Sequence, residues 1–226
     1  MDIQMKDVAE SLLGRALLNT DGYDLNDIEQ VEHTPGVRIP ETLKSFWQLV
    51  GRLKMFTSSF ELFLPPNEIF LEGDYLVFLQ ENQGVCYWSV KISDTDNSEL
   101  IVYQCSNSDA EHPEWHSEEM TLPYFLEMLM YYQCAQGGYA FGGAVYERNY
   151  QSKDDFWRFL KLSTEGWLKV VEHSVESHGL VIYMKDTNLI WHFTNKDGDV
   201  DNMIFASSLT SSGMKWLEKE YGFQEL

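Results

Sequence analysis

The sequence predicts an α+β fold. Its 226 residues are 44% hydrophobic and 14% aromatic, which is enough apolar side chain to fill a core and excludes intrinsic disorder for most of the chain. Segments with the three- and four-residue apolar spacing of helices are segregated from short runs of aromatic and β-branched residues with the character of antiparallel strands. Such segregation of the two types of element is typical of the α+β class.

Three helices are expected near the N-terminus. Residues 3–18 place apolar side chains on one helical stripe, and a second, short helix is expected from Asn26, which can form a capping box with Glu29. Residues 38–51 predict the third helix, because Pro40 suits the first helical position. The apolar face of this third helix is expected to contain Leu43, Phe46, Trp47 and Val50.

A sheet is predicted after these helices, followed by a closing helix. Four short runs bounded by Pro, Gly, Asn and Asp have the composition of strands: 60–64, 75–79, 85–91 and 100–104. Residues 80–84 have the length and chemistry of a hairpin turn. The closing helix is expected over 122–133, with an apolar face that packs on the sheet: Leu122, Phe125, Leu126, Leu129 and Met130.

The glycine-rich segment 136–143 (QGGYAFGG) is expected to link two parts of the chain, because four glycines in eight residues disfavour helix and strand alike. We therefore expect a core over 1–135 and an extension over 136–226 that docks on it. A phosphate-binding loop is disfavoured, because the segment follows a helix and lacks the lysine and hydroxyl of that motif. The extension is predicted to begin with a helix from Ser152. Four strands are expected to follow, over 167–171, 180–184, 189–193 and 200–205, and then a final helix over 211–221.

No catalytic constellation stands out in the sequence. His112 and His116 have the spacing of two zinc ligands on a helix, but Pro113 takes the place of the catalytic glutamate and disfavours helix through His112. No nucleophile motif is present. The cysteines lie in apolar stretches without a CxxC pair and are expected to be buried free thiols: Cys86, Cys105 and Cys134. We therefore predict a non-enzymatic protein without metal or cofactor, with a metal-dependent hydrolase using the two histidines as an alternative.

The compartment is predicted from the absence of targeting features. The N-terminal residues MDIQMKDVAE lack the basic and apolar regions of a secretory signal. No run of about 18 apolar residues could span a membrane. A cytoplasmic protein is therefore expected.

Charge is the most unusual property of the chain. The net charge is −20, and residues 55–147 contain fifteen acids and one base, Lys91, a net −14. Such a surface repels nucleic acid and anionic membranes and attracts a basic partner, although the acidity could also serve solubility alone. Residues 109–119 are expected to form a solvated acidic loop. The densest acidic positions, with an aromatic anchor among them, are predicted to bind the partner: Asp94, Asp96, Glu99, Asp109, Glu111, Glu114, Trp115, Glu118 and Glu119.

Four segments resemble, in their order and spacing, the SUKH superfamily, which includes bacterial immunity proteins and fungal cell-wall regulators. Residues 39–51 are similar to the family's "LP…l..f….NG" helix, although Val50 stands in place of the usual Asn. Residues 63–69 (FLPPNEI) resemble the turn after its first strand, and 76–88 resemble its hairpin. Residues 120–130 are similar to its closing helix.

The resemblance implies an antiparallel-rich sheet packed with N-terminal and closing helices, and a non-enzymatic protein-binding function. Residues 144–226 lie outside the family pattern and are expected to form a β-rich extension. Bacterial members of the family typically bind toxins, often nucleases or deaminases. The leading hypothesis is therefore a cytoplasmic immunity protein that neutralises a cognate toxin by direct contact, and the alternative is a regulatory scaffold of the same fold.

Overall fold

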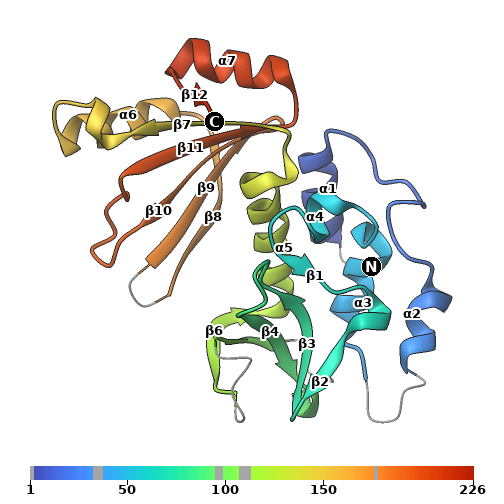
Figure 1. The fold of residues 1–226 in the computed structure, drawn as a ribbon. Coiled ribbons are helices and arrows are strands. Elements are labelled where there is room, and N and C mark those ends of the chain that lie inside the picture. Colours follow the sequence, from blue (N-terminus) through green and yellow to red (C-terminus); the bar gives the residue numbers. More distant parts are fainter. Residues whose placement is uncertain (1–2, 33–37, 95–98, 107–112, 176–177) are drawn as a thin grey trace. The chain divides into compact units, whose positions relative to one another are not determined.

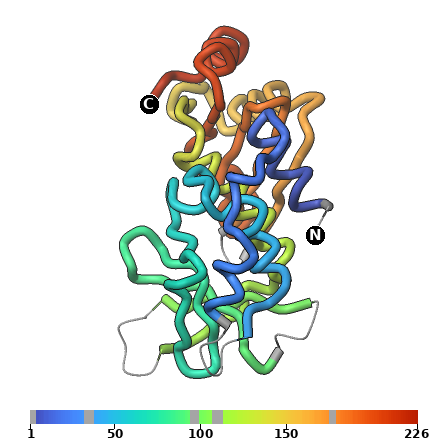
Figure 2. The backbone as a smooth tube through the Cα atoms, turned by 90° about the vertical axis from the view of Figure 1, so that its right-hand side faces the viewer, coloured from blue at the N-terminus to red at the C-terminus, as the bar shows by residue number. Residues whose placement is uncertain are grey.

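The structure, a computed structural model, describes residues 3–32, 38–94, 99–106, 113–175 and 178–226. Its helices and two antiparallel sheets confirm the α+β class (Figure 1). The chain divides into two compact units, which Figure 2 allows the reader to follow by colour. The first unit consists of Met1–Glu10 and Arg15–Gln133, and the second of Ser11–Gly14 and Cys134–Leu226.

Helices α1 to α5 occur before and after the first sheet: α1 (Ile3–Leu13), α2 (Leu25–Glu32), α3 (Glu41–Val50), α4 (Lys54–Thr57) and α5 (Leu122–Gln133). Helix α1 is shorter than the expected 3–18. It is followed at once by Gly14, whose φ of 63° is left-handed and typical of a residue just after a helix. The apolar residues Ala16 and Leu17 therefore lie outside the helix.

The first sheet has the order β1-β3-β4-β5-β6, and β2 also pairs with β3. Its strands are β1 (Leu62–Phe63), β2 (Phe70–Glu72), β3 (Tyr75–Gln80), β4 (Tyr87–Lys91), β5 (Ile101–Cys105) and β6 (Trp115–Thr121). Single-turn 3-10 helices η1 (Pro66–Glu68) and η2 (Ile92–Asp94) lie between strands.

Strand β6 corrects the expectation of an acidic loop for residues 115–119, while residues 109–112 of that predicted loop lie outside the described part of the chain. Its sequence WHSEEMT lacks the apolar alternation of a strand, yet it pairs with β5 from Cys105↔Trp115 to Ile101↔Thr121. β6 is an edge strand, where charged side chains are common because solvent lies beside them. The polar composition therefore reflects the position of the strand in the sheet.

Helices α3 and α5 cover one face of the first sheet. The ring of Phe63 on β1 lies 4.3 Å from Phe46 and 5.8 Å from Trp47, both on α3. The ring of Phe78 on β3 lies 5.8 Å from Phe63 and 6.0 Å from Phe125 on α5. The six residues expected in this core are all buried, which confirms the prediction: Leu43, Phe46, Trp47, Phe125, Leu126 and Leu129.

The second unit contains a six-stranded sheet of order β12-β7-β11-β10-β9-β8. Its strands are β7 (Phe141–Tyr146), β8 (Leu168–Val175), β9 (His178–Lys185), β10 (Asn188–Thr194), β11 (Met203–Ser208) and β12 (Gln224–Glu225). Helices α6 (Lys153–Ser163) and α7 (Ser211–Tyr221) pack on it, and their buried side chains share a core with the sheet: Phe156, Leu160, Met214, Leu217, Ile190 and Ile204. The 3-10 helix η4 (Glu147–Asn149) follows β7.

The glycine-rich segment is partly regular structure, although its glycines are expected to disfavour helix and strand; the chain kinks at Gly137 and enters a strand at Phe141. A π-helical turn, η3 (Cys134–Gly138), continues α5, and Gly142 and Gly143 lie in β7, which pairs with β11 and β12. A Cβ atom at Gly143 would lie 2.5 Å from Met214 Cε and 2.9 Å from the Gln224 carbonyl oxygen. A glycine in this strand therefore lets α7 and β12 pack close to the backbone.

Candidate functional site

The first sheet exposes a cluster of rings on the face opposite α3 and α5. Leu76, Val90 and Val102 are buried on the helix-covered face and pair across β3, β4 and β5. Side chains alternate between the faces of a strand, so the neighbouring aromatic residues point away from the helices. We call this cluster the aromatic face, and it consists of Phe70, Tyr75, Tyr87, Tyr103 and Trp115.

The rings of the aromatic face come from five strands and contact one another across the sheet. Tyr75 stacks on Trp115 with centroids 4.6 Å apart and planes inclined by 17°. Tyr75 also meets Tyr103 edge to face at 5.4 Å, and Phe70 meets Tyr87 in the same way at 5.6 Å. These are the preferred geometries of aromatic pairs, so the cluster is a preorganised surface.

Lys91, the only base between residues 55 and 147, lies in the aromatic face. Its Nζ atom is 5.0 Å from the ring centroid of Tyr103 and 5.6 Å from that of Tyr75. Both distances are within the range in which a ring attracts a cation. The structure thus shows that these ring faces accept a positive charge.

Trp115 is the member of the predicted binding set that lies in the aromatic face. It is half-buried, and the sequence argument did not connect it with Tyr75 or Tyr103, which come from other strands. Three acidic members of the set are exposed: Glu99, Glu114 and Glu119. Asp96, Asp109 and Glu111 lie outside the described residues, and so does the side chain of Asp94.

Glu118 points to the opposite face of the sheet. Its Oε1 atom accepts a hydrogen bond of 2.7 Å from Trp88 Nε1, and the Trp88 ring contacts Phe125 of α5. Burial raises the pKa of the Glu118 carboxyl, although the hydrogen bond from the indole lowers it. This carboxylate is therefore part of the packing beneath α5.

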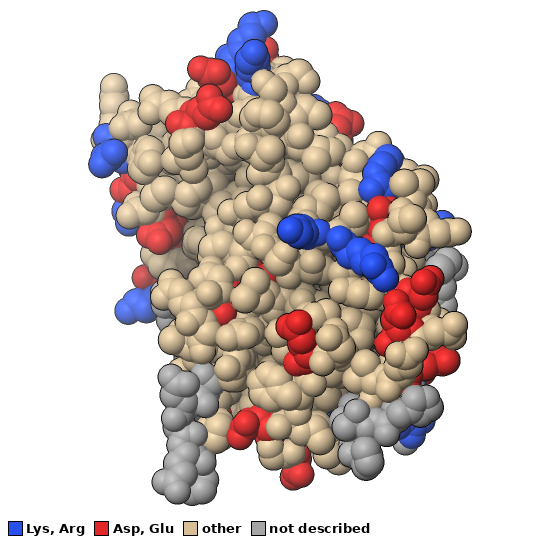
Figure 3. Space-filling model, turned by 45° about the vertical axis from the view of Figure 1, so that its right-hand side comes forward, with Lys and Arg blue, Asp and Glu red and all other residues tan. Residues whose placement is uncertain are grey.

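The charged side chains on one face of the molecule are visible in Figure 3. Acidic side chains form several separate groups there, with wide uncharged areas between them and some basic side chains nearby. An acidic field on this face is therefore patchy.

Glu61 in the first unit is a buried carboxyl group, and its surroundings explain its raised pKa. Burial raises the pKa of Glu61 to about 7, and its Oε2 accepts a hydrogen bond from the Asn82 backbone N–H. The side chain of Gln133, at the end of α5, accepts hydrogen bonds from the N–H groups of Phe60 and Glu61 and donates to the Glu61 carbonyl. Glu61 thus joins the start of the sheet to the β3–β4 turn.

The histidines do not form a metal site among the described residues. His116 is exposed on β6, and His112 lies outside the described part of the chain. Within that part, no group of three or more His, Cys, Asp and Glu side chains could hold a metal ion. The cysteines Cys86, Cys105 and Cys134 are buried thiols outside any disulfide, as predicted, and burial raises the pKa of the Cys86 thiol to about 12.

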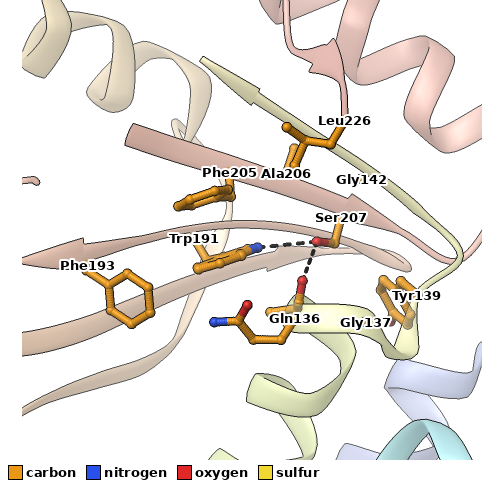
Figure 4. Close-up of a pocket in the computed structure, with 11 residues that line it drawn as sticks. Gln136, Gly137, Tyr139, Gly142, Trp191, Phe193, Phe205, Ala206, Ser207 and Leu226 are labelled. Atoms are coloured by element: carbon orange, nitrogen blue, oxygen red, sulfur yellow. Dashed lines mark hydrogen bonds between the residues drawn. The ribbon is translucent and has the colours of Figure 1, made fainter. Parts of the chain in front are cut away.

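The second unit contains a hollow of about 220 Å³ next to the η3 turn (Figure 4). Trp191 stacks on Phe205 at 4.1 Å, and its Nε1 donates to Ser207 Oγ, which donates in turn to the Ala135 carbonyl. Gln136 borders the same space. The hollow offers aromatic walls and hydrogen-bonding groups. Tyr139 also lines the hollow, and it donates its hydroxyl to the Leu12 carbonyl.

Comparisons with protein-family models, curated proteins and solved structures find no match for this chain. The SUKH resemblance therefore rests on the sequence motifs alone and stays a prediction. Among the described residues, every helix is too short or too polar to cross a membrane.

Proposed function

We propose that this chain is a protein-binding module whose aromatic face binds a partner with a basic surface. The observation that carries the proposal is the stack of Trp115 on Tyr75, beside Tyr103, on a sheet face that α3 and α5 leave uncovered. Rigid aromatic side chains in a preorganised cluster are the typical anchors of protein interfaces. The exposed carboxylates Glu99, Glu114 and Glu119 supply charge complementary to a basic partner.

We further propose that the partner is a bacterial toxin of the nuclease or deaminase type, which this protein neutralises in the cytoplasm by direct contact. Two observations support this choice. The motif order of residues 39–130 resembles a family that contains immunity proteins, and a protein that grips nucleic acid needs a basic surface. An acidic protein with an aromatic anchor can occupy such a surface.

The test is to co-express the chain with the product of the neighbouring reading frame and to measure association and dissociation rates. Trp115→Ala is expected to speed dissociation. The loss of binding free energy should be about 2 kcal/mol or more if Trp115 is an interface hot spot. Reversing Glu114 and Glu119 to lysine is expected to slow association at low salt. That effect should nearly vanish near 1 M salt, where the Debye length is about 3 Å.

The matched control reverses two exposed acids of the second unit, Glu165 and Asp197, to lysine. This control makes the same change in net charge without altering the aromatic face. Any difference in association rate between the two variants is therefore due to where the reversed charges lie. Binding with unchanged rates in Trp115→Ala and in the Glu114/Glu119 variant would contradict the proposal.

A further inference from the structure

We infer that the partner contributes an arginine whose guanidinium stacks on the outer face of Trp115. The inference rests on the proposed function and names the chemistry that the aromatic face recognises. It combines the aromatic cluster, the position of Lys91 and the geometry of the other cation–ring pairs in this chain.

Trp115 is the ring of the cluster best placed for an incoming cation. One of its faces is covered by Tyr75, and Lys91 lies over Tyr75 and Tyr103. Within the described part of the chain no cation lies over the Trp115 indole, and the side chain is half-buried at the sheet edge. Tryptophan attracts cations more strongly than tyrosine or phenylalanine, so this face is the strongest cation-binding ring surface in the cluster.

The described residues contain both arginine–ring and lysine–ring pairs. The guanidinium carbon is 4.6 Å from the ring centroid in the pair Arg52–Tyr23 and 4.7 Å in the pair Arg148–Tyr146. The ammonium of Lys91 lies 5.0 and 5.6 Å from its rings, and that of Lys185 lies 5.7 Å from Trp216. A planar, weakly hydrated guanidinium stacks on a flat ring, whereas a compact ammonium keeps more of its water.

Lys91 makes the site selective. Its positive charge lies beside the rings and disfavours a second compact cation nearby. Arginine spreads its charge over a plane and gains dispersion from stacking, so it tolerates this neighbour better than lysine does. The acidic balance of residues 55–147 favours either cation, so stacking geometry decides between them.

The experiment titrates the ¹⁵N-labelled full chain with capped peptides of three Gly-Arg repeats, three Gly-Lys repeats and three Gly-citrulline repeats. Citrulline keeps the planar shape of arginine without its charge. The Trp115 indole resonance, identified by its absence in Trp115→Phe, is expected to shift with the arginine peptide. The dissociation constant should be about threefold or more higher for the citrulline peptide, as expected for a cation–π contribution.

Two variants sharpen the test. Trp115→Phe keeps an apolar ring and should weaken arginine-peptide binding about threefold. Lys91→Met removes the neighbouring charge while keeping an unbranched side chain, and it should tighten binding of the lysine peptide more than that of the arginine peptide. Trp216→Phe in the second unit is the control, because Trp216 already carries Lys185 over its ring, and it should leave the Trp115 response unchanged.

Equal binding of the arginine and citrulline peptides, or an arginine-peptide response that leaves the Trp115 resonance in place, would overturn the inference. Weaker lysine-peptide binding in Lys91→Met would overturn it as well. The two proposals fail separately. If Trp115→Ala releases the toxin partner while arginine and citrulline peptides bind alike, the function stands and the guanidinium inference falls. If the arginine peptide alone moves Trp115 but the variants leave partner binding intact, the proposed interface falls.

Discussion

The indole of Trp115 lies parallel to the ring of Tyr75 at 4.6 Å, although β4 and β5 separate their strands in the sheet. Neighbouring strands are about 4.8 Å apart, so strands three positions apart in a flat sheet would be about 14 Å apart. The contact therefore requires both side chains to lean toward each other along the sheet, and Tyr75 also meets the ring of Tyr103 on the intervening strand β5. It is a tertiary contact between residues 40 positions apart in sequence.

This contact should be measurable as a coupling free energy. In a double-mutant cycle of Tyr75→Ala and Trp115→Ala, urea unfolding is expected to show a coupling of about 0.5–1.5 kcal/mol. Tyr124→Ala is the control partner, because Tyr124 is exposed on α5, and its effect should add to that of Trp115→Ala. A Tyr75–Trp115 coupling no larger than that of the control pair would contradict the stacked geometry.

Trp47 should be the most sensitive large side chain of the first core. It is fully buried, and its Nε1 donates a 3.0 Å hydrogen bond to the Leu64 carbonyl. Trp47→Ala is expected to lower the free energy of unfolding by about 3–5 kcal/mol, because it creates a cavity and leaves that carbonyl without its donor. Trp47→Phe should lose less. Chemical denaturation monitored by circular dichroism checks both values, and a loss below about 1 kcal/mol for Trp47→Ala would refute the packing.

Glu61 should make the stability of the first unit depend on pH. Its folded-state pKa of about 7 exceeds the ordinary value of 4.5, so the folded state binds more protons between these values. The free energy of unfolding therefore falls as pH rises from about 4.5 to 7, and the contribution of this residue is most favourable in acid. Glu61→Gln should remove this term and stabilise the protein by ~1–3 kcal/mol at pH 8, with little effect at pH 4.5.

Unfolding by urea at pH 5 and pH 8 measures this effect. Glu68→Gln is the matched control, because Glu68 is exposed a few residues away in the same unit. The control variant should keep the pH dependence of the wild-type protein. The assignment to Glu61 fails if Glu61→Gln keeps it as well.

Two adjacent glycines of β7 should respond differently to the same substitution. A Cβ at Gly143 would lie 2.5 Å from Met214 Cε and 2.9 Å from a backbone oxygen, whereas the nearest atom to a Cβ at Gly142 is 3.8 Å away. Gly143→Ala is expected to destabilise the protein by about 1–3 kcal/mol through overpacking, and Gly142→Ala should be nearly neutral. Equal melting temperatures for the two variants would show that α7 and β12 lie farther from β7 than described.

The sequence alone determined those helices and strands whose signal lies within one short segment of the chain. The apolar face of α3 follows from side chains spaced three and four residues apart, and the hairpin of β3 and β4 follows from two β-rich runs around a short polar turn. Such signals arise within one or two turns of chain, so they can be read without knowing the rest of the fold. The acidic bias that suggests a basic partner is likewise a property of composition alone.

Only the tertiary structure decided that β6 and β7 are strands, because their sequences lack the alternation of apolar and polar side chains. β6 is a strand because β5 offers it backbone hydrogen bonds, and β7 tolerates Gly142 and Gly143 because neighbouring strands and α7 hold it in place. The face on which a side chain lies depends on that pairing. Trp115 joins the aromatic face while Glu118, three residues on, turns beneath α5 to meet Trp88. Trp115 and Glu118 lie on opposite faces because side chains alternate between the two faces of a strand. Residues 115–121 form a strand only because they make backbone hydrogen bonds to a segment distant in sequence.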